Sequence, residues 1–191
     1  MAVARTQFKI QNSKFKMIKV FILTAFSFII FLAAVNKTFG QSDYVLPYPS
    51  SMPGGLPYKL HLFYELVSKY CYFGDFGQFD YNLKMADKYL VEAKTLFEYK
   101  QYLLGYSSLQ KSDRYFIDIL SSLDKARERD KNIAGKRLIL REASQKHIEV
   151  LQKMEMNTPD TFLWQPEKTM STELGIKKAL LNSILLRKNN L

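Results

Sequence analysis

Cysteine is almost absent from this sequence: among its 191 residues there is only one, Cys71. A single cysteine cannot form a disulfide within the chain, so the fold has to be stabilised by packing rather than by cross-links. Cys71 lies between two tyrosines, and we expect it to be a small buried apolar residue rather than a reactive thiol.

Residues that commonly build catalytic and metal sites are also scarce. The two histidines, His61 and His147, lie far apart in the sequence, whereas a metal site needs several converging ligands. We find no glycine-rich phosphate loop and no nucleophile motif. The sequence therefore indicates that the protein is not an enzyme, and it predicts no catalytic residue, no metal site and no cofactor. We expect His61 and Glu65 to form an ordinary surface pair, and His147 to be a core residue at a helix interface.

Acidic residues are missing from the first 40 positions, which contain six basic residues. The net charge of +10 is therefore uneven, because the rest of the chain has 22 basic and 18 acidic residues. Over residues 124–131 the two signs alternate, as on the solvated face of a helix. This pattern argues against nucleic acid as a partner.

The run from Val20 to Asn36 carries no charge and follows a basic segment, which is typical of an export signal. Its apolar part, residues 20–35, has 16 residues, which lies between a signal core of about 7–15 and a membrane crossing of about 20. Two alternatives remain open. Residues 1–40 are either a signal peptide cleaved after Gly40 or a retained anchor that holds the protein in the membrane through residues 20–35.

Both alternatives place the rest of the chain outside the cytoplasmic membrane. The sequence predicts an exported protein, either secreted after cleavage or anchored by its N-terminal helix. Met17 directly precedes the apolar run, so translation could start there or at Met1.

Prolines and hydrophobic periodicity divide the remaining chain. Four prolines in residues 41–57 exclude a helix and favour an extended spacer. Residues 58–156 are predicted to form a helical domain, residues 157–170 a loop, and residues 171–189 a C-terminal helix that opens at Ser171-Thr172-Glu173. Pro57 suits the first position of a helix.

Within the helical domain, apolar residues recur at steps of three and four, as in an amphipathic helix. The clearest stripe predicts a helix over 78–104, with turns at Gly74–Gly77 and Gly105–Ser108. Ser112 or Asp113 would cap the next helix. Residues 113–155 form either one helix or two, 113–132 and 136–155, because Gly135 is the only interruption.

No segment shows the alternation of a strand. The predicted fold class is all-α: an antiparallel helical bundle or long helical hairpin of four to five helices, after the N-terminal signal or anchor helix.

Aromatic residues gather in residues 58–81, which contain nine of them. They form either a core between the first two helices or an exposed face for a partner, and tyrosine suits both. The candidate interaction surface consists of Tyr64, Tyr72, Phe73 and Phe76.

Three segments are similar to a known family. Tyr44-Val45-Leu46-Pro47 with Leu56-Pro57-Tyr58-Lys59-Leu60, the helix over 81–93, and Lys146–Leu151 resemble bacterial domain-of-unknown-function family 5667, roughly over residues 44–155. The Leu56-Pro57 order and Tyr89 depart from the family pattern. The resemblance implies an extracytoplasmic helical domain and supplies no catalytic residues.

These observations favour a non-catalytic envelope protein that presents an amphipathic helical domain to a protein or another cell-envelope component. The alternative is a chaperone-like or small-ligand-binding module that uses the aromatic segment 58–81.

Overall fold

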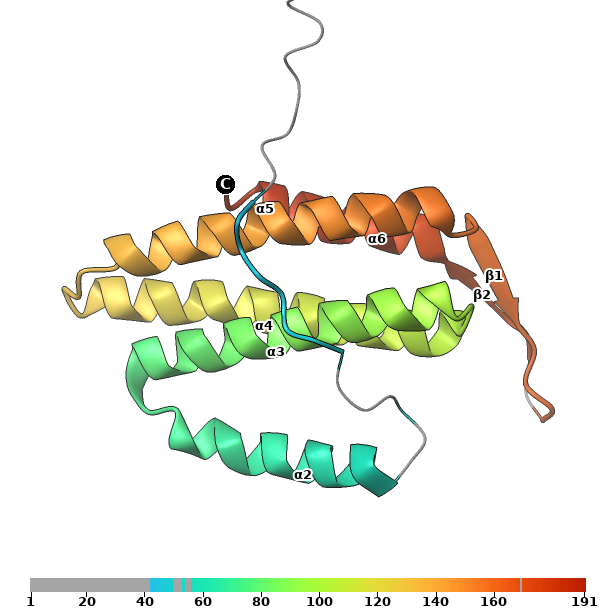
Figure 1. The fold of residues 1–191 in the computed structure, drawn as a ribbon, viewed down its shortest axis with the longest axis horizontal. Helices are drawn as coiled ribbons and strands as arrows, with labels where there is room; N and C mark the ends of the chain where they lie inside the picture. Colours follow the sequence, from blue (N-terminus) through green and yellow to red (C-terminus); the bar gives the residue numbers. More distant parts are fainter. Residues whose placement is uncertain (1–41, 50–52, 54–55, 169) are drawn as a thin grey trace, which may run out of the picture. The chain divides into compact units, whose positions relative to one another are not determined.

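The computed structural model describes residues 42–49, 53, 56–168 and 170–191. The predicted signal or anchor, with its apolar run at 20–35, lies outside these residues. Among the described residues the chain forms five α-helices and one small sheet (Figure 1). In chain order they are α2 (Leu56–Cys71), α3 (Gly74–Glu98), α4 (Tyr102–Glu128), α5 (Ala134–Asn157), β1 (Thr161–Trp164), β2 (Thr172–Gly175) and α6 (Ile176–Lys188). The predicted all-α bundle is confirmed.

Four of the helices form the bundle. Helix α3 packs against α4 and α5 against α6, and contacts of α3 with α5 and of α4 with α6 join the two pairs. Figure 1 shows α2 on the outer side of α3, set apart from the other four helices. None of the apolar core clusters contains a residue of α2.

The core consists of two large apolar clusters at different levels of the bundle. One lies towards the sheet and contains Leu90, Ala93, Phe97, Leu109, Ile148, Leu151, Met154, Ile176, Leu180 and Ile184. The other contains Phe79, Leu83, Ala86, Phe116, Ile119, Leu123, Leu140 and Ala143. On α3, α4 and α5, the buried polar residues Asp87, Asp113 and His147 fall between the members of these two clusters.

Helix α3 differs from the prediction at both ends. Gly74–Gly77, predicted as a turn between helices, is the first turn of α3, and the chain reverses at Tyr72 and Phe73 instead. Gly74 has φ of +72°, a conformation that costs glycine little. At its other end α3 stops at Glu98, six residues before the predicted Leu104.

The turn between α3 and α4 uses a lysine where glycine is usual. Lys100 has φ of +59°, and the amide of Gln101 donates to the carbonyl of Leu96 at 2.8 Å, the pattern of a Schellman motif. The predicted turn at Gly105–Ser108 is therefore wrong: these residues lie inside α4. A Cβ on Gly105 would stand 3.0 Å from the Phe97 ring, so glycine here permits close helix packing.

The same motif ends α4, where Asp130 has φ of +55° and the amide of Lys131 donates to the carbonyl of Ala126 at 3.0 Å. Residues 113–155 are thus two helices, not one. Ser112 and Asp113 lie in the middle of α4 and do not cap it. Asp75, near the start of α3, accepts hydrogen bonds from Arg129 at 3.0 Å and Lys131 at 2.8 Å, which ties α3 to this turn.

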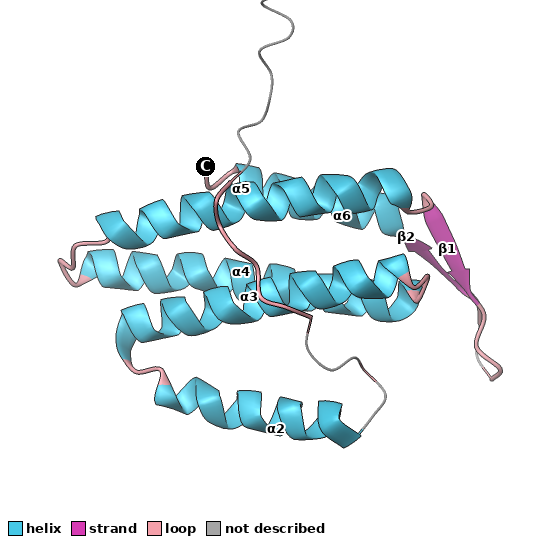
Figure 2. Cartoon of the chain, viewed as in Figure 1, coloured by secondary structure: helices cyan, strands magenta, loops and turns pink. Residues whose placement is uncertain are grey.

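The sequence predicted no β-strand, and this prediction is also wrong. Strands β1 and β2 pair antiparallel, with Thr161 opposite Gly175 and Trp164 opposite Thr172, and form a hairpin at one end of the bundle (Figure 2). The last helix begins at Ile176, so Thr172 and Glu173 belong to a strand rather than to a helix start.

The start of the described chain is not a free spacer. Residues 42–49 have no regular secondary structure, as their composition predicts, but they lie against the bundle (Figure 1). The Ser42 amide donates to Glu149 at 2.7 Å, and the Ser42 hydroxyl donates to the carbonyl of Glu142 at 3.0 Å. Burial would raise the pKa of Glu149, but the Ser42 amide and Lys146 outweigh it and lower that pKa.

Candidate functional site

Helix α2 turns its polar side to the bundle and its apolar side away from it. Its buried residues are Tyr58, Glu65 and Ser68, which lie on one side of the helix at 100° per residue. The opposite side is apolar and exposed. We call this the outer face of α2, and its members are Leu56, Leu60, Phe63, Tyr64, Leu66, Val67 and Tyr70.

The attachment of α2 to α3 is polar and centres on Glu65. The Glu65 carboxylate is ion-paired with Lys88 and accepts a hydrogen bond from the Tyr89 hydroxyl at 2.9 Å. The Glu65 carbonyl accepts from the Tyr81 hydroxyl at 3.1 Å. Near the start of α2, the Tyr58 hydroxyl donates to Glu92 at 3.3 Å. Burial and the nearby Glu92 carboxylate raise the pKa of Tyr58 to about 12, so this donor keeps its proton.

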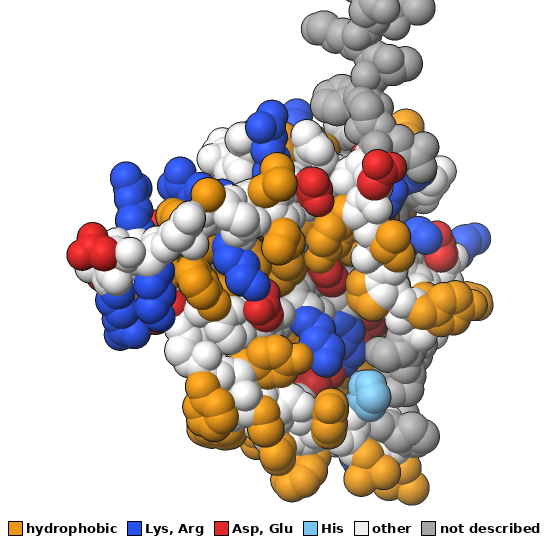
Figure 3. Space-filling model, turned by 60° about the vertical axis from the view of Figure 1, so that its left-hand side comes forward, with side chains coloured by type: hydrophobic (Ala, Val, Ile, Leu, Met, Phe, Trp, Pro, Cys, Tyr) orange, Lys and Arg blue, Asp and Glu red, His pale blue; other side chains and the backbone are white. Residues whose placement is uncertain are grey.

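The outer face is large for an uncovered surface. Hydrophobic side chains gather along the lower part of the molecule in Figure 3, where Figure 1 places α2. Its three aromatic side chains each have roughly 150–250 Å² to bury, and together with the four aliphatic ones the face offers on the order of 1,000 Å². The largest apolar patch of an ordinary monomer is about 300–600 Å². A surface above that size marks an interaction site.

The four predicted surface residues are divided between exposed and packed positions. Tyr64 is 61% exposed and Phe73 is 84% exposed. Tyr72 is half-buried and packs on Tyr81, with ring centroids 5.5 Å apart. Phe76 is half-buried with Lys131 over its ring at 5.5 Å. Only Tyr64 and Phe73 are therefore open to a partner.

Sequence reasoning missed most of the outer face because it left open whether segment 58–81 forms a core or an exposed face, and it named only aromatic residues as the candidate surface. The stripe at Leu60, Phe63 and Val67 was visible, but periodicity does not tell whether such a stripe faces the bundle. Glu65 was expected on the surface and is buried. Cys71 was expected to be buried and is exposed. The aromatic residues that do pack inside, such as Phe79 and Tyr81, belong to α3.

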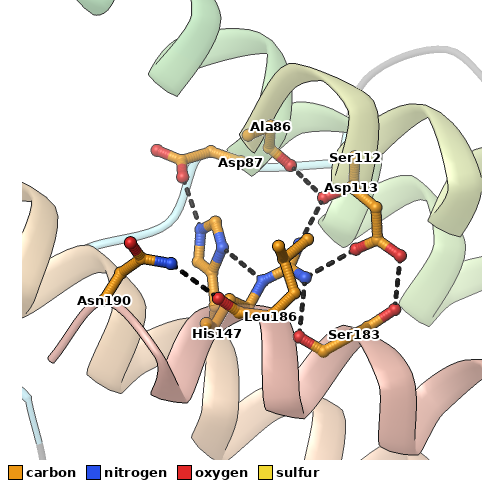
Figure 4. A network of polar contacts seen from close by, with 9 residues as sticks. Ala86, Asp87, Ser112, Asp113, His147, Ser183, Leu186 and Asn190 are labelled. Carbon is orange, nitrogen blue, oxygen red and sulfur yellow. Dashed lines mark hydrogen bonds and ion pairs between the residues drawn. The ribbon is translucent and has the colours of Figure 1, made fainter. Parts of the chain in front are cut away.

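A buried polar network joins all four bundle helices (Figure 4). Asp87 on α3 contacts Nε2 of His147 on α5 at 2.6 Å, and Nε of Arg187 on α6 donates to Nδ1 of His147 at 3.1 Å. Arg187 also donates to Asp113 on α4 at 2.6 Å. The Ser183 hydroxyl donates to Asp113 at 2.6 Å.

The network holds His147 neutral. Because Nδ1 accepts from Arg187, the proton of the neutral ring is on Nε2 and points at Asp87. Burial lowers the pKa of His147 below its ordinary 6.5, and the positive Arg187 adds to this, while Asp87 opposes it. Tyr44 from the N-terminal segment donates to the second oxygen of Asp87 at 2.6 Å, and burial with this carboxylate raises the pKa of Tyr44.

The network resembles an Asp–His pair of a hydrolase only in composition. A catalytic histidine needs one nitrogen free to accept a proton from a nucleophile. Here the second nitrogen accepts from Arg187, and both His147 and Arg187 are fully buried. The arrangement instead connects four helices at one level, so a shift of any helix along its axis would leave buried charges unpaired.

Two cavities of about 540 and 530 Å³ are lined by other parts of the chain. The first lies between α4, α5 and the C-terminus, near Leu138 and Leu191. The second lies where α3 ends, among Phe97, Tyr102 and Met154. Neither is lined by residues of segment 58–81 or by the buried network.

In the part of the chain that the structure describes, no three His, Cys, Asp or Glu side chains are placed to hold a metal ion together. None of the helices in that part combines the length and apolar character needed to cross a bilayer.

Comparison with known protein families, with curated proteins and with solved structures returns no match for this chain. The resemblance to domain-of-unknown-function family 5667 stays a prediction.

Proposed function

We propose that this is a non-catalytic exported protein whose helical domain binds another protein through the outer face of α2. The observation that carries the proposal is the orientation of α2: its polar residues attach it to α3, and its apolar residues are left exposed. Folding does not require that arrangement, because a helix turned the other way would bury more apolar surface. A partner that covers the face would remove the cost of exposing it.

The exported location is the second part of the proposal and rests on the basic N-terminus and the uncharged run 20–36. It is tested by expressing the protein with a C-terminal tag and determining its N-terminal sequence and membrane partition. Mature protein beginning near Gln41, or uncleaved protein in the membrane fraction, supports export. Uncleaved protein in the cytoplasm would contradict it.

Binding at the outer face is tested by photo-crosslinking in the cells that make the protein. A photoreactive phenylalanine replaces Tyr64, and in a matched control it replaces Tyr99, which is 73% exposed at the end of α3. We expect a defined protein adduct from position 64 and none from position 99. A folded variant that gives no adduct at position 64 would overturn the proposal.

The alternative function, holding small apolar guests or unfolded peptides, is favoured by the same exposed aromatic side chains. It predicts that an apolar dye or a model peptide binds the purified protein, and that changing the exposed Tyr64 and Phe73 to Ala weakens binding while the helical content remains. The two functions differ in their adducts. A dedicated partner gives one adduct of fixed mass, whereas a chaperone-like module gives many.

A further inference from the structure

We infer that the partner at the outer face of α2 is a second copy of this chain, with the two α2 helices packed antiparallel about a two-fold axis at Phe63. This inference rests on the proposed function, because it names the protein that covers the same face. Four observations carry it: the spacing of the apolar stripe, its charge, its size and the direction in which it points.

The spacing of the stripe is almost symmetric about Phe63. Leu56, Leu60, Phe63, Val67 and Tyr70 follow at steps of 4, 3, 4 and 3, the repeat by which one helix packs against another. When two copies are paired antiparallel with Phe63 opposite Phe63, Leu56 comes opposite Tyr70 and Leu60 comes opposite Leu66. The same patch then serves both subunits, which is the requirement of a two-fold interface.

The charge of the helix suits a protein surface of the same kind better than a lipid surface. The only acidic residue of α2, Glu65, is turned to the bundle and paired with Lys88. Its basic residues are Lys59 and Lys69, whereas a helix that binds the surface of a bilayer is typically rich in lysine and arginine. Lys59 lies beside Phe63 on the outer face and comes opposite Val67 in this pairing, so two outer faces can meet without placing like charges opposite each other.

The size of the face matches a stable dimer. Its area, on the order of 1,000 Å², is comparable to the about 800 Å² per partner of a standard protein–protein interface. Because the face points away from α3, two copies can meet there with their bundles on opposite sides of the helix pair.

The geometry is tested with the chain's single cysteine. Cys71 is exposed at the end of α2 and accepts a spin label without any substitution. Antiparallel pairing about Phe63 places the two Cys71 positions 16 helical residues apart, or about 24 Å along the axis. We expect dipolar spectroscopy on the purified protein to give one distance of roughly 25–30 Å once the label arms are included. A parallel pair would give a much shorter distance and would overturn the antiparallel arrangement.

The two-fold axis is tested with charge changes at Phe63, which is 67% exposed. Phe63→Glu and Phe63→Lys each place two like charges face to face, and we expect each to weaken dimerisation about 30-fold or more in sedimentation equilibrium. An equimolar mixture of the two variants should recover the dimer, because Glu then faces Lys. Leu163→Glu, at a 58% exposed position on β1, is the matched control and should dimerise like the unmodified protein.

Circular dichroism of each variant shows whether the helices are retained. A protein that is monomeric at every concentration, or a dimer that no Phe63 change affects, would overturn the inference. Monomers that float with anionic phospholipid vesicles would overturn it in favour of a lipid surface. Monomers whose position 64 still crosslinks to a different protein would overturn the second copy and leave the proposed function standing.

Discussion

His147 is the residue at which pH should act on stability. Its pKa is lowered in the folded state, so the unfolded chain binds more protons near pH 6 and stability falls as the pH falls below about 6.5. We expect this loss to become steeper below pH 6.5, up to a limit of about 1.4 kcal/mol per pH unit for one proton. Urea unfolding at several pH values measures it.

His147→Gln removes the titration and keeps groups that can bond to Asp87 and Arg187, so it should flatten the profile between pH 7 and pH 5.5. His61→Gln changes the only other histidine and serves as the control. A His147→Gln profile as steep as that of the unmodified protein would show that other groups cause the dependence.

Glu65 should control the attachment of α2. Glu65→Gln leaves Lys88 without its ion-pair partner at a site where both side chains are mostly buried, which costs about 3 kcal/mol. Hydrogen exchange in residues 56–71 should therefore speed up about 100-fold, while α4 to α6 change little. Glu98→Gln breaks an exposed pair with Lys94. This control should change hydrogen exchange neither in residues 56–71 nor in α4 to α6. Equal acceleration across all helices would mean that α2 does not open on its own.

The burial of a single residue could be predicted where the residue belongs to the apolar stripe of a helix. It could not be predicted where the residue is buried against a partner that is distant in the sequence. His147 was expected in the core and is fully buried, as predicted. Asp87 lies off the apolar stripe of its helix, yet it is buried. Its partners come from the N-terminal segment and from α5, 43 and 60 residues away. No local sequence pattern predicts a contact between residues so far apart.

At the helix ends, Lys100 offers a test of the turn between α3 and α4. Because its φ is +59°, Lys100→Gly should relieve strain and stabilise the protein by about 1 kcal/mol. Lys84→Gly, at an exposed position inside α3, should destabilise it by about 1 kcal/mol. Thermal unfolding of both variants gives the comparison. A loss of stability in Lys100→Gly would mean that the lysine side chain contributes more than its backbone strain costs.

Helix boundaries were predicted wrongly because contacts with other helices, and not local residue types alone, decide where the helices end. Gly105 was predicted to end one helix and Ser112 to cap the start of the next. Instead, Gly105 permits close packing on Phe97, and Ser112 donates to the carbonyl of Ala86 at 2.8 Å. The true stops use Lys100 and Asp130, residue types that rarely adopt positive φ. The β1–β2 hairpin was missed because its four-residue strands are too short to show alternation.

For the whole molecule, we expect the bundle to be independent of α2. A chain beginning at Gly74 should remain helical and unfold cooperatively, since no core cluster contains a residue of α2. A chain ending at Gly175 should lose cooperative unfolding, because it lacks Ile176, Leu180 and Arg187. Calorimetry distinguishes the two. An unfolded chain from Gly74 would show that α2 or the N-terminal segment is essential.

The bundle as a whole could be predicted because four amphipathic stripes can bury their apolar sides only against one another. Which side of α2 faces the bundle could not be predicted, because the apolar stripe of α2 resembles the stripe by which α3 packs into the core. What turns it outward is the position of Glu65, which lies on the other side of the helix and meets Lys88 and Tyr89.

Helix α2 is tied to the bundle at both ends, which gives it a high effective concentration at its own site. Tyr44 is bound to Asp87, and only residues 45–55 separate it from Leu56, while α3 begins three residues after Cys71. A segment held by such short links experiences an effective concentration in the millimolar range. The α2 of another molecule, at micromolar concentration, would compete for the Glu65 site at a disadvantage of about a thousandfold. Exchange of α2 between molecules should therefore be suppressed, which leaves the outer face as the proposed site of association.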